Sequence, residues 1–337
     1  FISATVGGVT ITETSTVNFG ASSSLNNFQT RTSTIGNHTG YYRLSMDAPD
    51  GTDSEVIGNR VVFSFSSPVR DLSFSLLDVD WENVASDFED QASIFATDSA
   101  GNPVPFTATP AGGAVQMAGN TGEGDAGAAA DQTIANIEIR FQGAVSNLTV
   151  EYTQGDEPTA SADQQAMGIS DFTFVAFDYG DAPNSYGTQL SSGARHVLGS
   201  RNLYLGANPP DGESDGAPGA AAATDDTTQV GGVDDEDGVT PPFPASSTSA
   251  GVYTVNVAYT NNTDADARLC GWIDFNKNGA FTSIDPNNER ACNTVGKGTS
   301  FASLVFTVPT DSRNNTCTDD SPCYARFRIA STTSEAE

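Results

Sequence analysis

The sequence predicts an all-β protein with two β-sandwich, jelly-roll-like domains joined by an acidic connector rich in glycine and aspartate. Short runs that alternate apolar and polar residues recur up to residue 176, separated by Gly, Asn, Pro and Asp. Similar runs return after Pro241. Between them, residues 178–238 hold too many Asp, Gly, Ala and Pro residues to form an ordinary core. We therefore expect three parts, which are residues 1–177, 178–240 and 241–337.

The strand pattern of the first part is clearest at residues 60–66, where RVVFSFS alternates apolar and small polar side chains. Comparable runs occupy residues 5–16, 72–79, 92–97, 134–141, 148–152 and 169–177. Many short strands separated by turn residues are typical of a sandwich, here of the jelly-roll kind. Residues 111–130 are mostly Gly and Ala, and we expect them to form a long loop that is mobile or packs over one end of a sheet.

The third part repeats this pattern at residues 251–260, 267–275, 299–308 and 324–331. In the last run, YARFRIAS, polar and apolar residues alternate, which places one set in solvent and the other in a core. We therefore expect a second, smaller sandwich.

The composition limits the possible partners. The chain has a formal net charge of −29, which argues against binding to nucleic acid or to anionic membrane surfaces, because like charges repel. It also has 19 Phe and 9 Tyr, enough to fill two cores. No stretch approaches the roughly 20 apolar residues of a membrane-spanning helix, so we expect no membrane insertion. Such an acidic surface suits a divalent cation, a salty medium, or both.

All four cysteines, Cys270, Cys292, Cys317 and Cys323, lie in the last quarter of the chain, and none has the close CxxC spacing of a zinc site. An even number of cysteines in an acidic, Thr- and Asn-rich chain favours disulfides and an oxidising compartment. Three pairings are possible. We expect Cys270 to pair with Cys292, and Cys317 to pair with Cys323 across a short loop. Four free buried thiols are the alternative.

The most specific motif is DFNKNGAFTSID at residues 274–285, which has the spacing of a twelve-residue calcium loop. Gly279 stands at the sixth position, where the loop turns sharply. The predicted oxygen donors are Asp274, Asn276, Asn278, the carbonyl of Ala280, and Asp285. The last position usually holds a longer Glu, and the flanking segments indicate strands rather than helices. The alternative is a plain hairpin, because Asn-Gly between apolar runs is a strong turn signal.

A second group of possible calcium ligands lies in LLDVDWENVASDFED, from residue 76 onward. Asp78 and Asp80 project to the same face near the end of a strand, and Asp87 and Asp90 follow in the next loop. Hard oxygen ligands from a strand end and a loop suit Ca²⁺, which takes about 6–8 of them. The alternative is a solvated acidic rim, with Trp81 filling a core.

The connector supplies a third group. Its carboxylates alternate within Gly-rich clusters, so that several can turn toward one cation, and without a cation they repel each other. The residues concerned are Asp211, Glu213, Asp215, Asp225, Asp234, Asp235 and Asp237. A fully solvated acidic linker is the alternative.

Residues 178–337 resemble the GEVED-type domain of bacterial cell-surface and secreted proteins. The pieces that carry the resemblance are, in chain order, DYGDAPNSYGT, GARH, LYLG, DGESDG, DDEDGV, GWIDFNKNGAF and YARFRIAS. Residues 1–176 resemble the jelly-roll ligand-binding region of fibrillar adhesins of the CshA kind, through SFSLLDVDWENVASDFEDQASIFATDSAGNPV. The two resemblances imply a bacterial surface adhesin or an extracellular matrix protein, and they identify no ligand.

We therefore expect a non-enzymatic, extracellular adhesin module at the bacterial cell surface that mediates attachment, or matrix and fibre formation as in a biofilm. Its expected partner is a host, cell-surface or matrix ligand, either protein or glycan. Calcium would turn a repelling acidic joint into a stiff one. Sites of extracellular modules have dissociation constants of about 10⁻⁴–10⁻³ M.

Three alternatives stay open. One is a calcium-dependent, lectin-like module that uses Trp81, Tyr41 or Tyr42 as a stacking platform. Another is a self-assembling fibre subunit, whose sheet a neighbour's strand completes. The third is a secreted glycoside hydrolase, whose carboxylate pair only geometry identifies. We expect no catalytic residues, because the chain has only His38 and His196 and lacks HExxH and GxSxG motifs.

Overall fold

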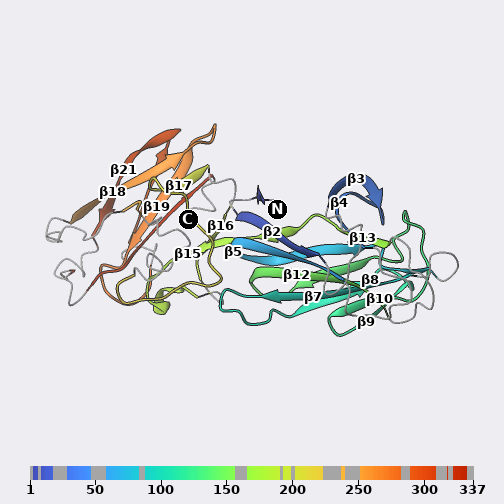
Figure 1. Cartoon of the computed structure of the whole chain (residues 1–337). Coiled ribbons are helices and arrows are strands. Elements are labelled where there is room, and N and C mark those ends of the chain that lie inside the picture. Colours follow the sequence, from blue (N-terminus) through green and yellow to red (C-terminus); the bar gives the residue numbers. More distant parts are fainter. Residues whose placement is uncertain are drawn as a thin grey trace. The chain divides into compact units, whose positions relative to one another are not determined.

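The computed structural model describes residues 3–6, 9–17, 29–46, 58–82, 88–155, 165–189, 193–198, 202–222, 237–239, 251–281, 289–308, 317 and 322–331. The chain divides into two compact units, unit 1 (Phe1–Ala176) and unit 2 (Phe177–Glu337), which are drawn in Figure 1. Strands make up nearly all of the regular structure in the described ranges, so the predicted all-β, sandwich-like class is confirmed.

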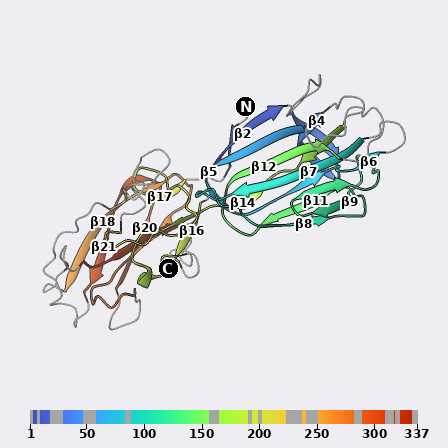
Figure 2. The same cartoon turned by 60° about the horizontal axis from the view of Figure 1, so that its bottom comes forward.

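In the described part of unit 1, the strands form one 14-stranded sheet that curls into two layers (Figure 2). They are β1 (Ser3–Val6), β2 (Val9–Val17), β3 (Gln29–Ile35), β4 (His38–Met46), β5 (Gly58–Leu77), β6 (Trp81–Glu82), β7 (Phe88–Thr97), β8 (Phe106–Pro110), β9 (Val115–Ala118), β10 (Thr121–Gly124), β11 (Ile137–Phe141), β12 (Val145–Gln154), β13 (Gln165–Ile169) and β14 (Thr173–Val175).

Strand β5 belongs to both layers. Its first half pairs with β2 and β12, and β12 continues the first layer to β7, β10 and β9. Its second half pairs with β11, β13 and β14 in the second layer. The sequence predicts two separate strands here, at residues 60–66 and 72–79. The predicted break between them is wrong, because β5 runs through both segments as one strand. The chain stays extended through Pro68 and bends at Asp71, whose φ of 52° is left-handed.

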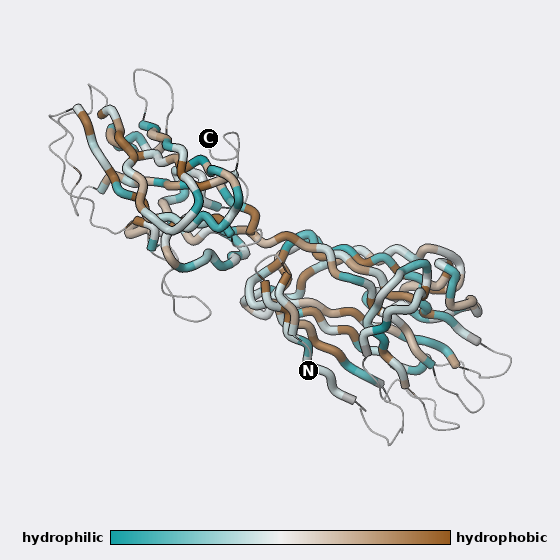
Figure 3. Tube along the Cα trace, turned by 90° about the horizontal axis from the view of Figure 1, so that it is seen from above, coloured by the Kyte–Doolittle hydropathy of each residue, from teal (hydrophilic) through white to brown (hydrophobic). Residues whose placement is uncertain are grey.

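The core of unit 1 lies between the layers. Buried and partly exposed residues alternate along β5, β7 and β12. Figure 3 colours the chain trace by hydropathy, and hydrophobic and hydrophilic stretches follow one another along it. The ring of Phe172 contacts Phe63 of the first layer at 4.9 Å and Phe74 of the second at 5.4 Å, measured between centroids. Edge-to-face aromatic contacts of this kind stabilise the join between the layers.

Residues 111–130 are not one long loop, which corrects the sequence prediction. They contain the hairpin β9–β10, which turns at Gly119 (φ 66°) and pairs with β7. Asn120 Nδ2 donates a hydrogen bond of 3.2 Å to the carbonyl of Ile94. A side chain at Gly122 would collide with Ile137, so the small residue lets the hairpin pack closely on its neighbours.

The described residues of unit 2 form two three-stranded sheets and one small two-stranded sheet (Figures 1 and 2). The sheets are β17–β18–β21, β20–β19–β22 and β15–β16. The elements are β15 (Phe177–Tyr179), the 3-10 turn η1 (Asn184–Tyr186), β16 (Arg195–Val197), β17 (Leu203–Leu205), β18 (Val252–Asn261), β19 (Ala267–Ile273), β20 (Arg290–Val295), β21 (Gly298–Thr307) and β22 (Ala325–Ala330). The buried ring of Phe275 packs against Tyr253 and Phe306 in the core, at 5.9 and 6.1 Å between centroids.

Both predicted disulfides are confirmed. Cys270 of β19 is joined to Cys292 of β20, its register partner in the sheet. Cys317 is joined to Cys323, six residues further along the chain. The first bridge therefore links adjacent strands, and the second closes a short loop before β22.

Candidate functional site

The loop at residues 274–280 follows β19 and is organised around Asp274, whose side chain is fully buried. Asp274 Oδ1 accepts a hydrogen bond of 3.2 Å from the amide of Asn278, and Oδ2 accepts one of 2.9 Å from the amide of Gly279. Lys277 and Gly279 have left-handed φ angles of 59° and 82°. These angles turn the loop back onto the carboxylate.

Two other predicted calcium ligands, Asn276 and Asn278, also accept hydrogen bonds from backbone amides of this loop. Asn276 Oδ1 accepts from the amide of Asn278 at 3.0 Å, and Asn278 Oδ1 accepts from the amide of Ala280 at 2.9 Å. The structure thus places Asp274, Asn276 and Asn278 around one tight loop, at the first, third and fifth positions of the motif. The last predicted ligand, Asp285, lies outside the described residues.

Sequence reasoning missed Glu289, which is fully buried beside this loop. The amide of Asn276 lies 3.5 Å from Glu289 Oε1, and the carbonyl of Glu289 accepts from the amide of Ile273 at 3.1 Å. Glu289 immediately precedes β20, and the pairing of β20 with β19 brings it to the end of β19 where Asp274 begins the loop. Only the strand pairing gives that signal.

Tyr186 covers the buried carboxylate of Asp274. Its hydroxyl donates a hydrogen bond of 2.7 Å to Asp274 Oδ2, and its ring lies 4.8 Å from that of Phe281. Burial, followed by the contact with Asp274, raises the pKa of Tyr186 above its ordinary value, so the hydroxyl keeps its proton. The guanidinium of Arg326 lies over Phe281 and donates to the carbonyl of Tyr186 at 2.9 Å. These contacts fix η1 against the loop.

In unit 1 the structure brings Asp78, Asp80 and Asp90 together, whereas Asp87 lies outside the described residues. The amide of Asp90 donates to the carbonyl of Asp80 at 2.9 Å, and the amide of Ala128 donates to Asp80 Oδ2 at 2.7 Å. Burial, followed by the neighbouring charge of Asp80, raises the pKa of Asp78 to about 7.

Asp90 is the most enclosed member of this group. It is almost completely buried, and its Oδ1 accepts a hydrogen bond from the hydroxyl of Tyr152. Burial raises the pKa of Asp90 well above its ordinary value, in spite of that hydrogen bond. Asp80 and Asp90 are therefore buried carboxylates held by protein donors, and Asp78 is partly exposed beside them.

Carboxylates of the connector accept hydrogen bonds from backbone amides. Asp237 Oδ1 accepts from the amide of Ala207 at 2.9 Å, and Glu213 Oε2 accepts from the amide of Tyr179 at 2.8 Å. Asp215 accepts a hydrogen bond of 2.9 Å from the amide of Gly216. Asp211, four residues earlier, is partly buried. The remaining predicted ligands, Asp225, Asp234 and Asp235, lie outside the described residues.

Within the described ranges, no three His, Cys, Asp or Glu side chains are arranged to hold a metal ion. The loop at Asp274 differs from such a cluster of ionisable side chains. Of the described residues, it has only two carboxylates, Asp274 and Glu289, and its other oxygen donors are side-chain amides and a backbone carbonyl. The aromatic residues predicted as stacking platforms are partly buried in their own unit. Tyr42, for example, packs edge-on against Phe63 at 5.7 Å between centroids.

Comparison with known proteins identifies part of unit 2. Residues 268–337 match the family model of the GEVED domain, which confirms the expected resemblance over these residues. The chain matches no curated protein. The resemblance of unit 1 to the ligand-binding region of fibrillar adhesins stays a prediction.

The described part of the chain contains no helix with the length and apolar character needed to cross a membrane. Two disulfides are typical of proteins that fold in an oxidising compartment. Together with the GEVED match, they indicate an extracellular protein, and the match is compatible with a non-enzymatic surface module.

Proposed function

We propose that the chain is a non-enzymatic attachment module of an extracellular bacterial surface protein, and that calcium stabilises its second unit. The attachment partner is a host, cell-surface or matrix ligand. The match of residues 268–337 to the GEVED domain supports the surface role, and the two disulfides support the compartment.

The observation that carries the calcium proposal is the burial of two carboxylates, Asp274 and Glu289, beside one tight loop. Buried carboxylates are unfavourable unless hydrogen-bond donors or a cation offset their charge. The amides of Asn278 and Gly279 and the hydroxyl of Tyr186 offset part of the charge of Asp274. Asp274 Oδ2 accepts two of these hydrogen bonds and Oδ1 accepts one, so Oδ1 is the oxygen better placed to bind a cation.

The donor set fits calcium better than zinc or magnesium. All the donors are oxygens, from Asp274, Asn276, Asn278, Glu289 and the carbonyl of Ala280. Calcium accepts such mixed oxygen sets with irregular geometry, whereas magnesium demands a near-ideal octahedron and zinc prefers nitrogen and sulfur. When bound, calcium would neutralise the two carboxylates and fix the loop between β19 and β20.

The test is a thermal melt of the whole chain in EDTA, in a few millimolar Ca²⁺ and in the same concentration of Mg²⁺. A ligand present at 100 times its dissociation constant adds about 2.7 kcal/mol to the stability of the state that binds it. We expect a higher melting temperature for unit 2 in Ca²⁺ and little change in Mg²⁺.

Variants then locate the effect. Asp274→Asn and Glu289→Gln each remove one charge while keeping the shape of the side chain, and each should abolish most of the calcium-dependent rise. Asp264→Asn is the matched control, because the side chain of Asp264 is 97% exposed and pairs with Lys297 at 2.7 Å. Identical melts of the parent chain in EDTA and Ca²⁺ would rule out the calcium proposal.

A further inference from the structure

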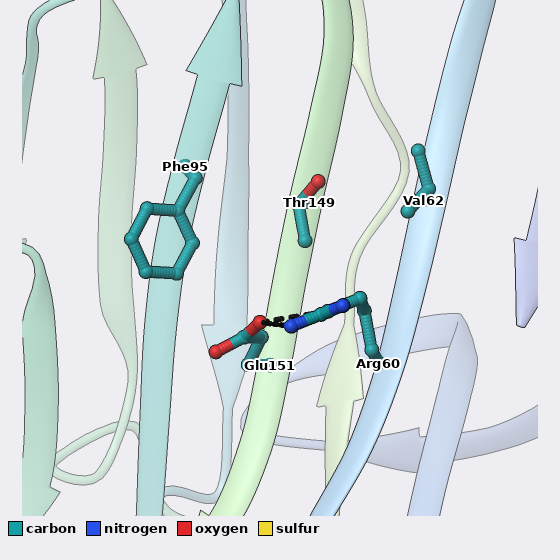
Figure 4. Close-up of a pocket in the computed structure, with 5 residues that line it drawn as sticks. All are labelled: Arg60, Val62, Phe95, Thr149 and Glu151. Carbon is teal, nitrogen blue, oxygen red and sulfur yellow. Dashed lines mark hydrogen bonds and ion pairs between the residues drawn. The ribbon is translucent and has the colours of Figure 1, made fainter. Parts of the chain in front are cut away.

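An open depression with a volume of about 340 Å³ lies on one face of the first layer of unit 1 (Figure 4). The residues that line it come from three adjacent strands and are Arg60 and Val62 of β5, Phe95 of β7, and Thr149 and Glu151 of β12. Their neighbours along each strand are buried in the core, so these five side chains form the solvent face of the layer.

The strand register arranges these residues in two rows that run across the strands. Phe95, Thr149 and Val62 are direct partners in one row. Ser93, Glu151 and Arg60 form the next row. Side chains on adjacent strands lie about 5 Å apart, so each row is a line of closely spaced groups across the strands. An extended ligand has room to lie along a row.

Phe95 provides the apolar surface of the depression. It is 46% exposed, although the neighbouring positions in the strand, Ile94 and Ala96, are buried. An aromatic ring left in water on a sheet face leaves apolar area that a ligand can cover. The adjacent side chain, Thr149, is short, which leaves the ring accessible from the side of the depression (Figure 4).

Arg60 and Glu151 provide a charged donor and acceptor within the same depression. Arg60 Nε donates a hydrogen bond of 2.7 Å to Glu151 Oε1, and Arg60 Nη2 forms an ion pair with the same oxygen. Glu151 Oε2 points away from the guanidinium (Figure 4). The pair carries no net charge, and hydrogen bonds to ionised groups are stronger than neutral ones.

The polar side chains around the depression already hold each other in place. Ser93 and Thr121 share a hydrogen bond of 2.7 Å, and Ser64 donates to Asn147 at 2.8 Å. On the other side, Thr153 donates to Gln91 at 2.9 Å. Side chains that are ordered before a ligand arrives lose little entropy when it binds.

We propose that this face binds a neutral polysaccharide chain. A sugar ring has an apolar C–H face, which fits the exposed ring of Phe95, and a rim of hydroxyls, which fits Glu151, Arg60 and Thr149. A protein partner would need a larger apolar centre, whereas the lining here offers only Phe95 and Val62. An anionic polymer would be repelled by a chain with a net charge of −29.

The inference names a ligand class for the attachment function proposed above and rests on it. Its test is native affinity electrophoresis of the whole chain in gels that contain laminarin, dextran, mannan or, as the anionic comparison, polygalacturonate. An array of neutral oligosaccharides extends the panel. We expect at least one neutral glycan to retard the chain, and we expect Phe95→Ala and Glu151→Gln each to weaken that binding at least tenfold.

Phe301→Ala is the matched control, because Phe301 is 74% exposed on β21 of unit 2 and lies outside the depression. It should bind as the parent chain does. Circular dichroism checks that Phe95→Ala keeps its fold. The inference is overturned if no neutral glycan binds, if only polygalacturonate binds, or if Phe95→Ala binds as tightly as the parent chain. None of these results alters the calcium melt, which tests the stabilisation of unit 2 separately.

Discussion

The hydroxyl of Tyr186 donates a hydrogen bond of 2.7 Å to Asp274 Oδ2 across a sequence separation of 88 residues. Tyr186 belongs to the motif DYGDAPNSYGT, and Asp274 opens the motif DFNKNGAF. The two most distinctive motifs of the second half of the chain therefore meet at one buried carboxylate. The connector is not an independent linker at this point, because its 3-10 turn completes the environment of the loop after β19.

Removal of the Tyr186 hydroxyl should destabilise unit 2. Tyr186→Phe leaves a buried carboxylate with one donor fewer, and we expect the free energy of unfolding to fall by about 1–3 kcal/mol. The chain has two tryptophans, Trp81 in unit 1 and Trp272 in unit 2, so a Trp81→Phe background lets urea unfolding of unit 2 be followed by Trp272 fluorescence. Tyr324→Phe is the control in the same unit, since that hydroxyl donates to the carbonyl of Ala220 at an exposed position and contacts no carboxylate of the described residues. Equal effects of the two variants would contradict the prediction.

Unit 1 should lose stability as the pH rises in the absence of calcium. The pKa of Asp78 is raised from 3.8 to about 7 in the folded protein, so the folded state binds the proton more tightly than the unfolded chain does. The free energy of unfolding therefore falls as the pH increases from about 4 through about 7.

Asp78→Asn should remove the part of this dependence that Asp78 contributes, whereas the buried Asp90 keeps its own. A tenfold difference in proton affinity corresponds to about 1.4 kcal/mol, and we expect the variant to be about 1–3 kcal/mol more stable than the parent at pH 8 and similar to it at pH 4. Thermal melts in EDTA across this range measure the difference. Asp71→Asn is the control. Asp71, like Asp78, has a left-handed backbone (φ 52° at Asp71), but its side chain is exposed. If Asp78→Asn is less stable than the parent at pH 8, the prediction fails.

The two disulfides should differ in their contributions to stability. Cys270 and Cys292 are 22 residues apart and Cys317 and Cys323 are 6 apart. Closure of the longer loop restricts the unfolded chain more, by about 3 kcal/mol against about 2 kcal/mol. We expect the double variant Cys270→Ala/Cys292→Ala to be less stable in urea than Cys317→Ala/Cys323→Ala. The reverse order would show that the bridges act mainly through the folded state.

Gly206 should tolerate no side chain. Its φ of 76° is left-handed, and a Cβ atom there would collide with Asp237 Oδ1. We expect Gly206→Ala to lower the free energy of unfolding of unit 2 by about 2–4 kcal/mol, of which the left-handed backbone accounts for about 1–2. Gly101→Ala separates the two causes, because Gly101 has a φ of 82° with open space around it. Urea unfolding of both variants makes the comparison, and equal losses would mean that the collision is relieved without strain.

The sequence predicts the elements of this fold better than their connections. Alternation at residues 60–66 indicates a half-buried strand because the period of the pattern is the period of the backbone. The continuation of β5 through Pro68 is not evident, since a proline and a charged Asp71 usually mark a turn. Gly122 also suggests a loop although it lies in a strand. Its missing side chain allows close packing against Ile137.

The candidate site, like the strands, is predictable only where a local sequence pattern defines it. Asp274, Asn276 and Asn278 are recognisable because their spacing alone defines a loop. Glu289 lies four positions beyond the motif, and only the pairing of β19 with β20 brings it to Asp274. The depression at Phe95 gives no local signal at all, because its two rows join residues of three strands that lie far apart in the sequence.

Because β5 is shared by both layers of unit 1, the two layers cannot separate while it stays paired. Its partners range from Ile11, opposite Phe65, to Val175, opposite Arg70, so most of the unit must assemble before the strand is satisfied on both sides. Folding through such distant pairings is slow, because long loops close before their contacts form. Amide protons in the middle of β5 should accordingly exchange with solvent only when the entire unit unfolds.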